Sequence, residues 1–355
     1  MKILVISLAG IGDTLLATPL LHELRLNFPA AQIDVFVMQG AGARDLLEGN
    51  PHINSIYLEE LLKQGTLTAL RSLRRFRKER YDVSLNTYPQ SKIHYRAVSR
   101  YIGARRRLSH TYDNWGFLDN LLVNSTVAQD YQLHSIENNL RFLPLLGAQP
   151  KLQKHDSEIF LSDAEQKWAD NTVRELGLNG QRILGVHVGS GKTKNLELRR
   201  WPLENYIQLF QRLTQQRPEV PIVLFGGPEE KEDHERILRE IQSKSVLVAP
   251  SRSLRQAAAL VGKCHVFLSV DTALMHIAAA MKVPRQLVIE TPTFNKTIEP
   301  HGRPYKLIPN PAVKGRNLDY YRYDGRGIQG SPEELRQCML AVKVEDVLAA
   351  VTSAL

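Results

Sequence analysis

Cysteine is scarce in this sequence. The chain has 355 residues and two cysteines, Cys264 and Cys338, which lie far apart and lack metal-ligand spacing. This scarcity excludes a small secreted fold held by disulfide bonds and the common cysteine-based zinc motifs, so we expect a protein of the reducing cytosol. At this length two domains are expected rather than a single core.

Long apolar segments are absent as well. No run is long enough to span a bilayer. The first apolar run, residues 2–8, is short and soon interrupted by glycines, unlike the core of a signal peptide. Aromatic residues make up 7% of the chain, which is ordinary for a soluble α/β protein. We expect a cytoplasmic protein, either free or peripheral at the inner face of the inner membrane.

Two nucleotide-binding motifs are incomplete. After Gly10 and Gly12 the dinucleotide fingerprint G-x-G-x-x-G lacks its third glycine, so NAD and FAD are not inferred. The sequence GSGKT at 189–193 misses the P-loop spacing by one residue, because valine stands at position 186, and this argues against an ATPase. A glycine turn that follows a strand and has cations nearby still suits a phosphate.

Acidic residues are few in one basic stretch, residues 71–107. The formal net charge of the chain is +9, and within this stretch only Glu79 and Asp82 oppose a dozen lysines and arginines. Such a run can be a solvated helix face. It can equally meet an anionic membrane surface or an acidic acceptor. Zinc-finger spacing and RNP-type aromatic motifs are missing, so a nucleic-acid partner is not expected.

The first 25 residues have the pattern of a buried strand, a glycine turn and a helix. This order places Asp13 at the carboxyl end of a strand, where open α/β sheets bind their ligands. Aspartate at a helix start is also a common N-cap. Both interpretations of Asp13 are open at this level.

Strand and helix patterns then alternate, which predicts a parallel, doubly wound sheet. A polar linker at residues 147–158 separates two such halves, and the pattern restarts after it. We therefore expect a Rossmann-like domain over residues 1–150 and a second over residues 151–335, facing a cleft. Residues 336–355 form a C-terminal helical segment that could pack back on the N-terminal domain.

In the second half, three loops follow strands, at residues 189–193, 226–230 and 271–276. The last begins a helix, whose N-terminus offers unpaired N–H groups and a partial positive charge to an anion. Asp271 or Thr272 could instead be a plain cap, and His276 a core histidine. Three such loops in one half favour a shared ligand site.

The motifs resemble glycosyltransferase family 9, the ADP-heptose:lipopolysaccharide heptosyltransferases and their relatives. The resemblance rests on Gly12-Asp13, the Gly189-Ser190 turn with Arg199-Arg200-Trp201-Pro202, Gly226-Gly227-Pro228-Glu229, and Asp271-Thr272-Ala273 with His276. It covers nearly the whole chain in matching order. It implies the GT-B fold, with the acceptor bound by the first domain and the nucleotide sugar by the second.

The resemblance also implies inverting transfer that needs no metal and no cofactor, from a nucleotide-diphosphate sugar such as ADP-heptose to an acidic glycan or glycolipid acceptor. Asp13 would be the general base. The donor would be bound by the helix N-terminus at Thr272 and Ala273 and by the residues that match the family's other donor-site positions: Gly12, Ser190, Arg199, Glu229, Asp271 and His276.

Three positions depart from the family pattern. Arg199 stands where the family usually has lysine, Ala273 where it has glycine, and Glu290 where a Phe-Gly pair usually begins. These departures leave the identity of the donor open, ADP-heptose in particular. Two other functions are compatible with the same motifs: a nucleotide-sugar-binding module that has lost transfer, and a GT-B-like nucleotide-sugar epimerase.

Overall fold

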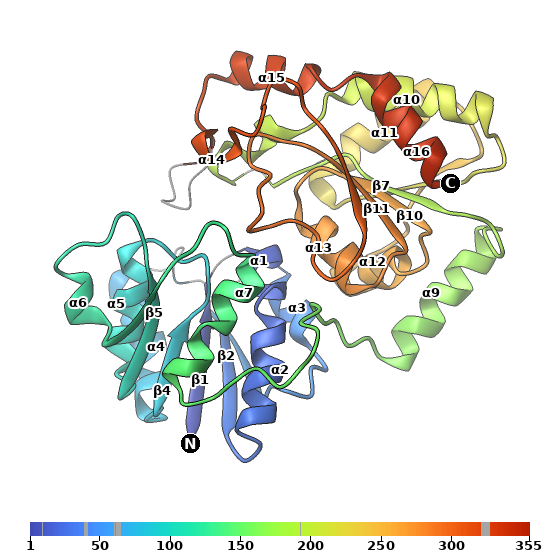
Figure 1. Ribbon diagram of the computed structural model, residues 1–355. Coiled ribbons are helices and arrows are strands. Elements are labelled where there is room, and N and C mark those ends of the chain that lie inside the picture. Colours follow the sequence, from blue (N-terminus) through green and yellow to red (C-terminus); the bar gives the residue numbers. More distant parts are fainter. Residues whose placement is uncertain (9, 39–41, 60, 62–64, 192, 321–326) are drawn as a thin grey trace. The chain divides into compact units, whose positions relative to one another are not determined.

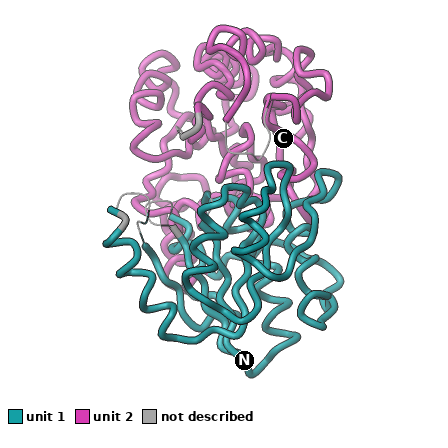
Figure 2. Tube along the Cα trace, turned by 90° about the vertical axis from the view of Figure 1, so that its left-hand side faces the viewer, with its two compact units in different colours: residues 1–160, 323–325 teal, residues 161–322, 326–355 magenta. Residues whose placement is uncertain are grey.

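The computed structural model describes the whole chain except residues 9, 39–41, 60, 62–64, 192 and 321–326 (Figure 1). The described chain divides into two compact units (Figure 2). The first comprises Met1–Phe160, and the second begins at Leu161 and includes the C-terminus. Each unit has its own parallel sheet and its own hydrophobic core.

The first unit is built on a six-stranded parallel sheet with the order β3-β2-β1-β4-β5-β6. Its strands are β1 (Lys2–Ser7), β2 (Gln32–Met38), β3 (Ser55–Glu59), β4 (Val83–Asn86), β5 (Arg106–Thr111) and β6 (Ser125–Ala128). The central strand β1 is apolar from Ile3 to Ile6 because both of its faces are covered. Ile3 and Val5 belong to one core cluster, and Leu4 and Ile6 belong to another.

Helices cover both faces of this sheet (Figure 1). The face that carries Ile3 and Val5 is covered by α2 (Thr18–Asn27), α7 (Ser135–Leu140) and α8 (Phe142–Leu145). The opposite face, which carries Leu4 and Ile6, is covered by α4 (Thr66–Lys78) and α5 (Ile93–Ile102). The remaining helices of this unit are short: α1 (Ile11–Leu15), α3 (Ala43–Leu47) and α6 (Asp119–Leu122).

The helix that the sequence pattern predicts over residues 131–146 is two short helices, α7 and α8, that meet at Arg141. Pro144 has no N–H to bond the carbonyl of residue 140, and its ring crowds that carbonyl, so one continuous helix is disfavoured. Strands β5 and β6 were not predicted. The sequence of β5, RRLSHT, is too polar to show the pattern of a buried strand.

The second unit repeats the arrangement with the order β12-β11-β10-β7-β8-β9. Its strands are β7 (Leu184–His187), β8 (Ile222–Phe225), β9 (Val246–Val248), β10 (Val266–Ser269), β11 (Arg285–Ile289) and β12 (Tyr305–Ile308), and all neighbours pair in parallel. The sequence analysis did not predict β12, where apolar and polar residues alternate only briefly.

Its helices are α9 (Asp163–Glu175), α10 (Leu203–Gln216), α11 (Lys231–Ile241), α12 (Leu254–Val261), α13 (Ala273–Ala280), α14 (Asn317–Tyr320), α15 (Pro332–Leu340) and α16 (Val344–Ala354), with 3-10 turns η1 (Thr193–Arg199) and η2 (Pro228–Glu230). The C-terminal segment packs in this unit. Val347 and Val351 of α16 share a buried cluster with Leu209 and Phe210 of α10, so the apolar face of this segment is covered within the second unit.

In both sheets the strand order reverses at a central pair, β1 beside β4 and β7 beside β10. Loops leaving the carboxyl ends of such a pair diverge to opposite sides and leave a crevice for a ligand. The chain therefore has two candidate sites, one in each unit. Within the described residues, no helix has the length and apolar character needed to cross a membrane.

Candidate functional site

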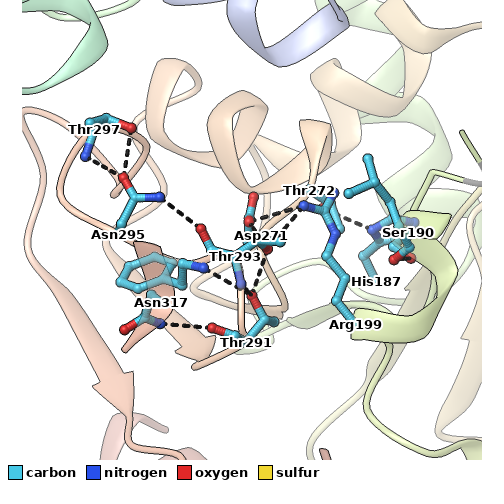
Figure 3. Close-up of polar contacts among 12 residues, drawn as sticks. His187, Ser190, Arg199, Asp271, Thr272, Thr291, Thr293, Asn295, Thr297 and Asn317 are labelled. Carbon is cyan, nitrogen blue, oxygen red and sulfur yellow. Dashed lines mark hydrogen bonds and ion pairs between the residues drawn. The ribbon is translucent and has the colours of Figure 1, made fainter. Parts of the chain in front are cut away.

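At the reversal point of the second sheet, the loops after β7 and β10 lie side by side because these strands are paired, Val186 opposite Leu268. The first loop carries Ser190 and the second carries Asp271 and Thr272 (Figure 3). All three residues are buried. The two strand-end loops that the sequence predicts to share a site are therefore neighbours.

A buried ion pair lies at the centre of this site. Arg199, the last residue of η1, donates from Nη1 to Asp271 Oδ2 at 3.0 Å and to Thr293 Oγ1 at 3.3 Å. The Thr293 hydroxyl donates in turn to Asp271 Oδ2 at 2.5 Å (Figure 3). The guanidinium Nε of Arg199 is buried and has no hydrogen-bond partner among the described residues. The guanidinium is therefore not fully satisfied by the protein groups that the structure describes.

Thr272 occupies the N-cap position of α13, but its side chain does not cap the helix. Its hydroxyl lies 3.1 Å from Nδ1 of His187, at the end of β7 (Figure 3). The first N–H groups of α13 are therefore not satisfied by the cap side chain that usually accepts from them. A helix N-terminus in this condition, close to an arginine, suits an anion.

Two histidines beside these groups are neutral at pH 7. Burial lowers the pKa of His276 to about 4, with Asp271 opposing the shift and Arg199 adding to it. Burial, helped by Arg200, lowers the pKa of His187 to about 3. Each ring can therefore offer one N–H and one acceptor nitrogen. Ala273, the first residue of α13, is half-buried.

Ser190 is held by protein groups. Its hydroxyl donates to the carbonyl of Leu196 at 2.9 Å, and Arg200 binds its carbonyl at 2.9 Å. Arg200 also pairs with Glu230 at 3.1 Å. A Cβ at the adjacent Gly189 would lie 2.2 Å from Oε1 of Glu230, so any larger residue there would displace that side chain. These contacts fix the shape of the loop after β7.

The acidic residue that the fold buries in this region is Glu230, next to the predicted Glu229. Glu229 is exposed on η2. Glu230 is buried and accepts from the N–H of Gly227 at 2.9 Å. Burial raises the pKa of Glu230, while Gly227 and Arg200 oppose the rise. An exposed Glu229 is available to a ligand, whereas Glu230 supports the loop.

In the first unit, Asp13 lies in the first turn of α1 at the carboxyl end of β1. Its Oδ2 accepts from the N–H of Gly10 at 3.2 Å, so it does act as a helix-start acceptor. Asp13 and Gly12 are half-buried. Burial and, after it, the charge of Asp13 raise the pKa of Tyr95. The carboxylate therefore has a tyrosine in its electrostatic neighbourhood.

The loop after β4 is tied to the end of β1. Gln90 donates from Nε2 to the carbonyl of Ile6 at 2.6 Å and to Thr87 Oγ1 at 2.9 Å. Its own N–H is bound by the hydroxyl of Tyr112 at 2.8 Å. These bonds fix the loop after β4 against the end of β1, the strand that precedes α1 and Asp13.

Comparison with known proteins decides the family. The sequence model described as "Glycosyltransferase family 9 (heptosyltransferase)" matches residues 69–312, more than half of the chain. The chain belongs to glycosyltransferase family 9. It is thus a glycosyltransferase, as its motifs predict.

Characterised relatives of this family 9 enzyme include lipopolysaccharide heptosyltransferase 2 from Escherichia coli, 27% identical over 330 residues, which are 87% of this chain and 88% of that protein. The protein of the same name from Salmonella typhimurium is 28% identical over the same coverage. Lipopolysaccharide heptosyltransferase 3 of Escherichia coli is 25% identical over 280 residues, 77% of this chain and 78% of that protein.

Solved structures confirm the fold. A family 9 glycosyltransferase from Veillonella parvula superposes with a TM-score of 0.78 at 18% identity, covering 99% of this chain and 96% of that one. The Escherichia coli ADP-heptose heptosyltransferase II gives 0.71 at 21% identity, covering 100% and 98%. The prediction of two Rossmann-like sheets in a GT-B fold is confirmed.

Several supporting residues of this glycosyltransferase were missed by the sequence analysis. They are Arg200, Glu230, Thr291, Thr293, Asn295 and Asn317. Thr291 Oγ1 lies 2.9 Å from Thr293 Oγ1, which reaches Asp271 (Figure 3). Arg200 stands inside the Arg-x-Trp-Pro motif and could have been found there. Thr291 and Thr293 follow β11, and their position after the carboxyl end of a strand is the sequence feature that could have identified them.

Glu290, one of the departures from the family pattern, is turned to β12 and its following loop. Its Oε2 accepts from the N–H of Asn310 at 2.8 Å, and its Oε1 lies 3.5 Å from Nδ2 of Asn317. Thr291 and Thr293, just after it, make the contacts toward Asp271. Glu290 therefore contacts the loop after β12 and Asn317, while the threonines that follow it in the chain reach Asp271.

The basic stretch 71–107 is only partly available to a partner. Arg96 is buried and bonds Asp119 at 2.5 Å. Arg75 pairs with Glu59 at 2.8 Å, and Arg105 pairs with Asp82 at 3.2 Å. The exposed cations on α4 or just after it are Arg71, Arg74, Arg75, Arg77, Lys78 and Arg80, and those elsewhere in the stretch are Arg100, Arg105 and Arg106. Most of the exposed positive charge of this stretch therefore lies on α4 or directly after it.

Proposed function

We propose that this family 9 enzyme transfers a heptose or related sugar from a nucleotide-diphosphate donor to a lipopolysaccharide-core or other surface-glycan acceptor. The observation that carries the proposal is the uncapped N-terminus of α13 beside Arg199, at the reversal point of the second sheet. The named heptosyltransferases among its relatives support this choice of donor and acceptor.

In this proposal the diphosphate lies at the N-terminus of α13. The N–H groups of Ala273 and its neighbours and the guanidinium of Arg199 stabilise the charge that builds on the leaving diphosphate. These fixed positive groups supply what a metal ion would otherwise supply, so the proposed transfer does not need one. Ser190, Thr272, His276 and Asp271 shape and orient this pocket, and the exposed Glu229 faces the nucleoside.

Asp13 is the proposed general base. It removes the proton of the acceptor hydroxyl as that oxygen attacks the anomeric carbon from the face opposite the diphosphate, which inverts the configuration. The position of this carboxylate at the carboxyl end of β1 supports the proposal, because ligands bind at that edge of open α/β sheets. Its bond to the N–H of Gly10 orients the carboxylate.

The donor assignment is tested by thermal shift with ADP-, UDP-, GDP- and dTDP-sugars. A ligand present at 100 times its Kd adds about 2.7 kcal/mol of stability, and we expect ADP-heptose to give the largest rise in Tm. Adenosine, which lacks the diphosphate, is the control and should give a much smaller rise. If none of the four nucleotide sugars moves the melting curve, the donor site is wrongly assigned.

We also propose that the exposed basic side of α4 meets an acidic acceptor or anionic lipid. Leu67 on α4 is 81% exposed beside Arg71 and Arg74, a combination that suits a lipid surface.

The double variant R71Q/R74Q should bind vesicles containing anionic lipid about 30-fold more weakly, at ~1 kcal/mol per cation. The control R239Q/R252Q, on the second unit, should bind as the wild type does. Equal binding by all three proteins would remove this proposal.

A further inference from the structure

Two histidines and a glutamate from distant parts of the chain meet in the first unit. His22 lies on α2, His52 lies in the turn before β3, and Glu158 lies in the last residues of this unit. Their side-chain nitrogens and a carboxylate oxygen all lie within 4.8 Å of one another. All three side chains are partly buried. The role proposed above for the strand ends makes no use of them.

The spacing of these groups fits a bound metal ion. Nδ1 of His22 lies 3.0 Å from Oε1 of Glu158, and Nε2 of His52 lies 3.6 Å from Oε2. Ligands at about 2.0–2.1 Å from a tetrahedral zinc ion are about 3.3 Å apart, and the two observed distances bracket that value. The His52 distance is too long for a hydrogen bond. A hydrogen bond therefore explains the position of His22 but not that of His52.

The two imidazole rings are also arranged as a pair. Their centroids are 3.9 Å apart and their planes are inclined by 16°. One nitrogen of each ring lies near the Glu158 carboxylate, at the two distances given above. Because a metal ion lies in the plane of each imidazole that binds it, one of the two stacked rings must rotate for both to bind the same ion. Imidazole and carboxylate are ligands that Zn²⁺ and related divalent transition metals accept together.

We propose that His22 Nδ1, His52 Nε2 and the Glu158 carboxylate form a binding site for a divalent transition-metal ion of the Zn²⁺ type, with water completing the coordination. Nothing in the family assignment or in the proposed transfer reaction requires this site. The proposal therefore stands or falls separately from the proposed function.

Local contacts hold two of the three proposed ligands. The N–H of Glu158 donates to the hydroxyl of Thr18 at 2.9 Å, and the N–H of His52 donates to Oδ1 of Asn50 at 2.9 Å. The ring of Phe160 packs edge-on against His52, with centroids 5.7 Å apart. These contacts fix the backbone from which the two side chains extend.

One nearby cation opposes a metal ion. Arg25 donates to the carbonyl of His52 at 3.2 Å, so its positive charge is close to the site. Its guanidinium is held by the carbonyls of Pro29 and Ala31 and by Oδ1 of Asn54. The carboxylate of Glu158 offsets this charge within the ligand set. The affinity we expect is therefore lower than that of a site with an additional anionic ligand.

The position of the cluster indicates a structural role. His52 precedes the first residue of β3, so it lies at the amino end of a parallel strand. Asp13 follows β1 and lies at the carboxyl end. The metal would therefore bind at the edge of the sheet away from the proposed base. It would join α2 and the turn before β3 to the segment through which the chain leaves the first unit.

The test is a calorimetric titration of the full chain, stripped by a chelator, with Zn²⁺ alone. We expect one ion per chain, and Co²⁺ at the same site should show the visible absorption of a low-symmetry N/O site. The variant H52Q removes a proposed metal ligand. It should weaken Zn²⁺ binding by about 100-fold or more, because loss of a residue that only hydrogen-bonds a ligand already costs about 10–100-fold. H52Q removes no side-chain hydrogen bond to Glu158 and is the first choice. H22Q, which breaks one, is the second.

The matched control is H155Q. His155 lies in the same segment, bonds Glu23 at 3.0 Å and is not a member of the cluster. We expect H155Q to bind Zn²⁺ as tightly as the wild type. Circular dichroism of each variant checks that the chain is folded. Wild-type protein that takes up no Zn²⁺, or an H155Q loss equal to that of H52Q, overturns the proposal.

Discussion

Replacement of Asp13 by asparagine is expected to lower kcat for sugar transfer by about 10²–10⁴-fold, the range that a positioned general base contributes. Asparagine keeps an oxygen that can accept from the N–H of Gly10, so α1 should still form. What it loses is the ability to take a proton from the acceptor hydroxyl. The measurement is the steady-state rate of nucleoside-diphosphate release with donor and acceptor both saturating.

The D13N experiment has two controls. Donor affinity, measured by thermal shift, should be unchanged, because the proposed donor site is on the second sheet. The variant D45N changes an exposed aspartate in the first turn of another short helix, α3, and should leave kcat within about twofold of the wild type. If D13N transfers sugar at the wild-type rate, Asp13 is not the base.

Replacement of Arg199 by methionine is expected to have two separate effects. It leaves the carboxylate of Asp271 buried without its ion-pair partner, which should lower the free energy of unfolding by about 3–5 kcal/mol. It also removes the cation proposed to bind the diphosphate. Loss of charge-assisted hydrogen bonds worth about 1.5–3 kcal/mol should weaken donor binding by ~10–150-fold.

A second variant separates these effects. The double variant R199M/D271N removes the unpaired buried charge, so most of the stability should return while donor binding stays weak. R199K keeps the charge but not the planar fork of donors, and it should retain part of both properties. The measurements are urea unfolding and titration with the nucleotide diphosphate. Donor binding restored in R199M/D271N would show that Arg199 acts only on stability.

The sequence predicted the structure best where neighbouring residues alone determine the local conformation. The apolar run of β1 needs both faces covered, and the glycine turn before Asp13 needs a strand before it and a helix after it. Both features are local, and both lie where predicted. The polar strand β5 has no such pattern, because its place in the sheet comes from pairing with β4 and β6.

The proposed donor site was only partly predictable for the same reason. Asp271 and Thr272 follow a strand, and that local order pointed to them. The partner of each side chain comes from elsewhere: Arg199 for Asp271, and His187 for Thr272. Whether Thr272 caps α13 or faces His187 depends on a residue 85 positions away. The contact between His22 and Glu158 also joins residues far apart in the sequence, 136 positions, and local patterns do not predict it.

Local spacing does not show which of two adjacent acidic residues is buried. Glu229 and Glu230 both follow Gly226-Gly227-Pro228, and the motif alone favoured Glu229. The fold buries Glu230 against Gly189 and Arg200, because a glycine at 189 leaves room for that carboxylate. Only the packing of the β7 loop against η2 distinguishes the two residues.

Transfer itself is the most direct test of the proposed function. The purified chain is incubated with ADP-heptose and a lipopolysaccharide-core acceptor, and the products are examined by mass spectrometry and NMR. We predict that the acceptor gains one sugar with the anomeric configuration inverted, that one ADP is released for each, and that added Mg²⁺ leaves the rate unchanged. A bound donor left intact with every acceptor, or converted to an epimer with no acceptor present, would contradict the account.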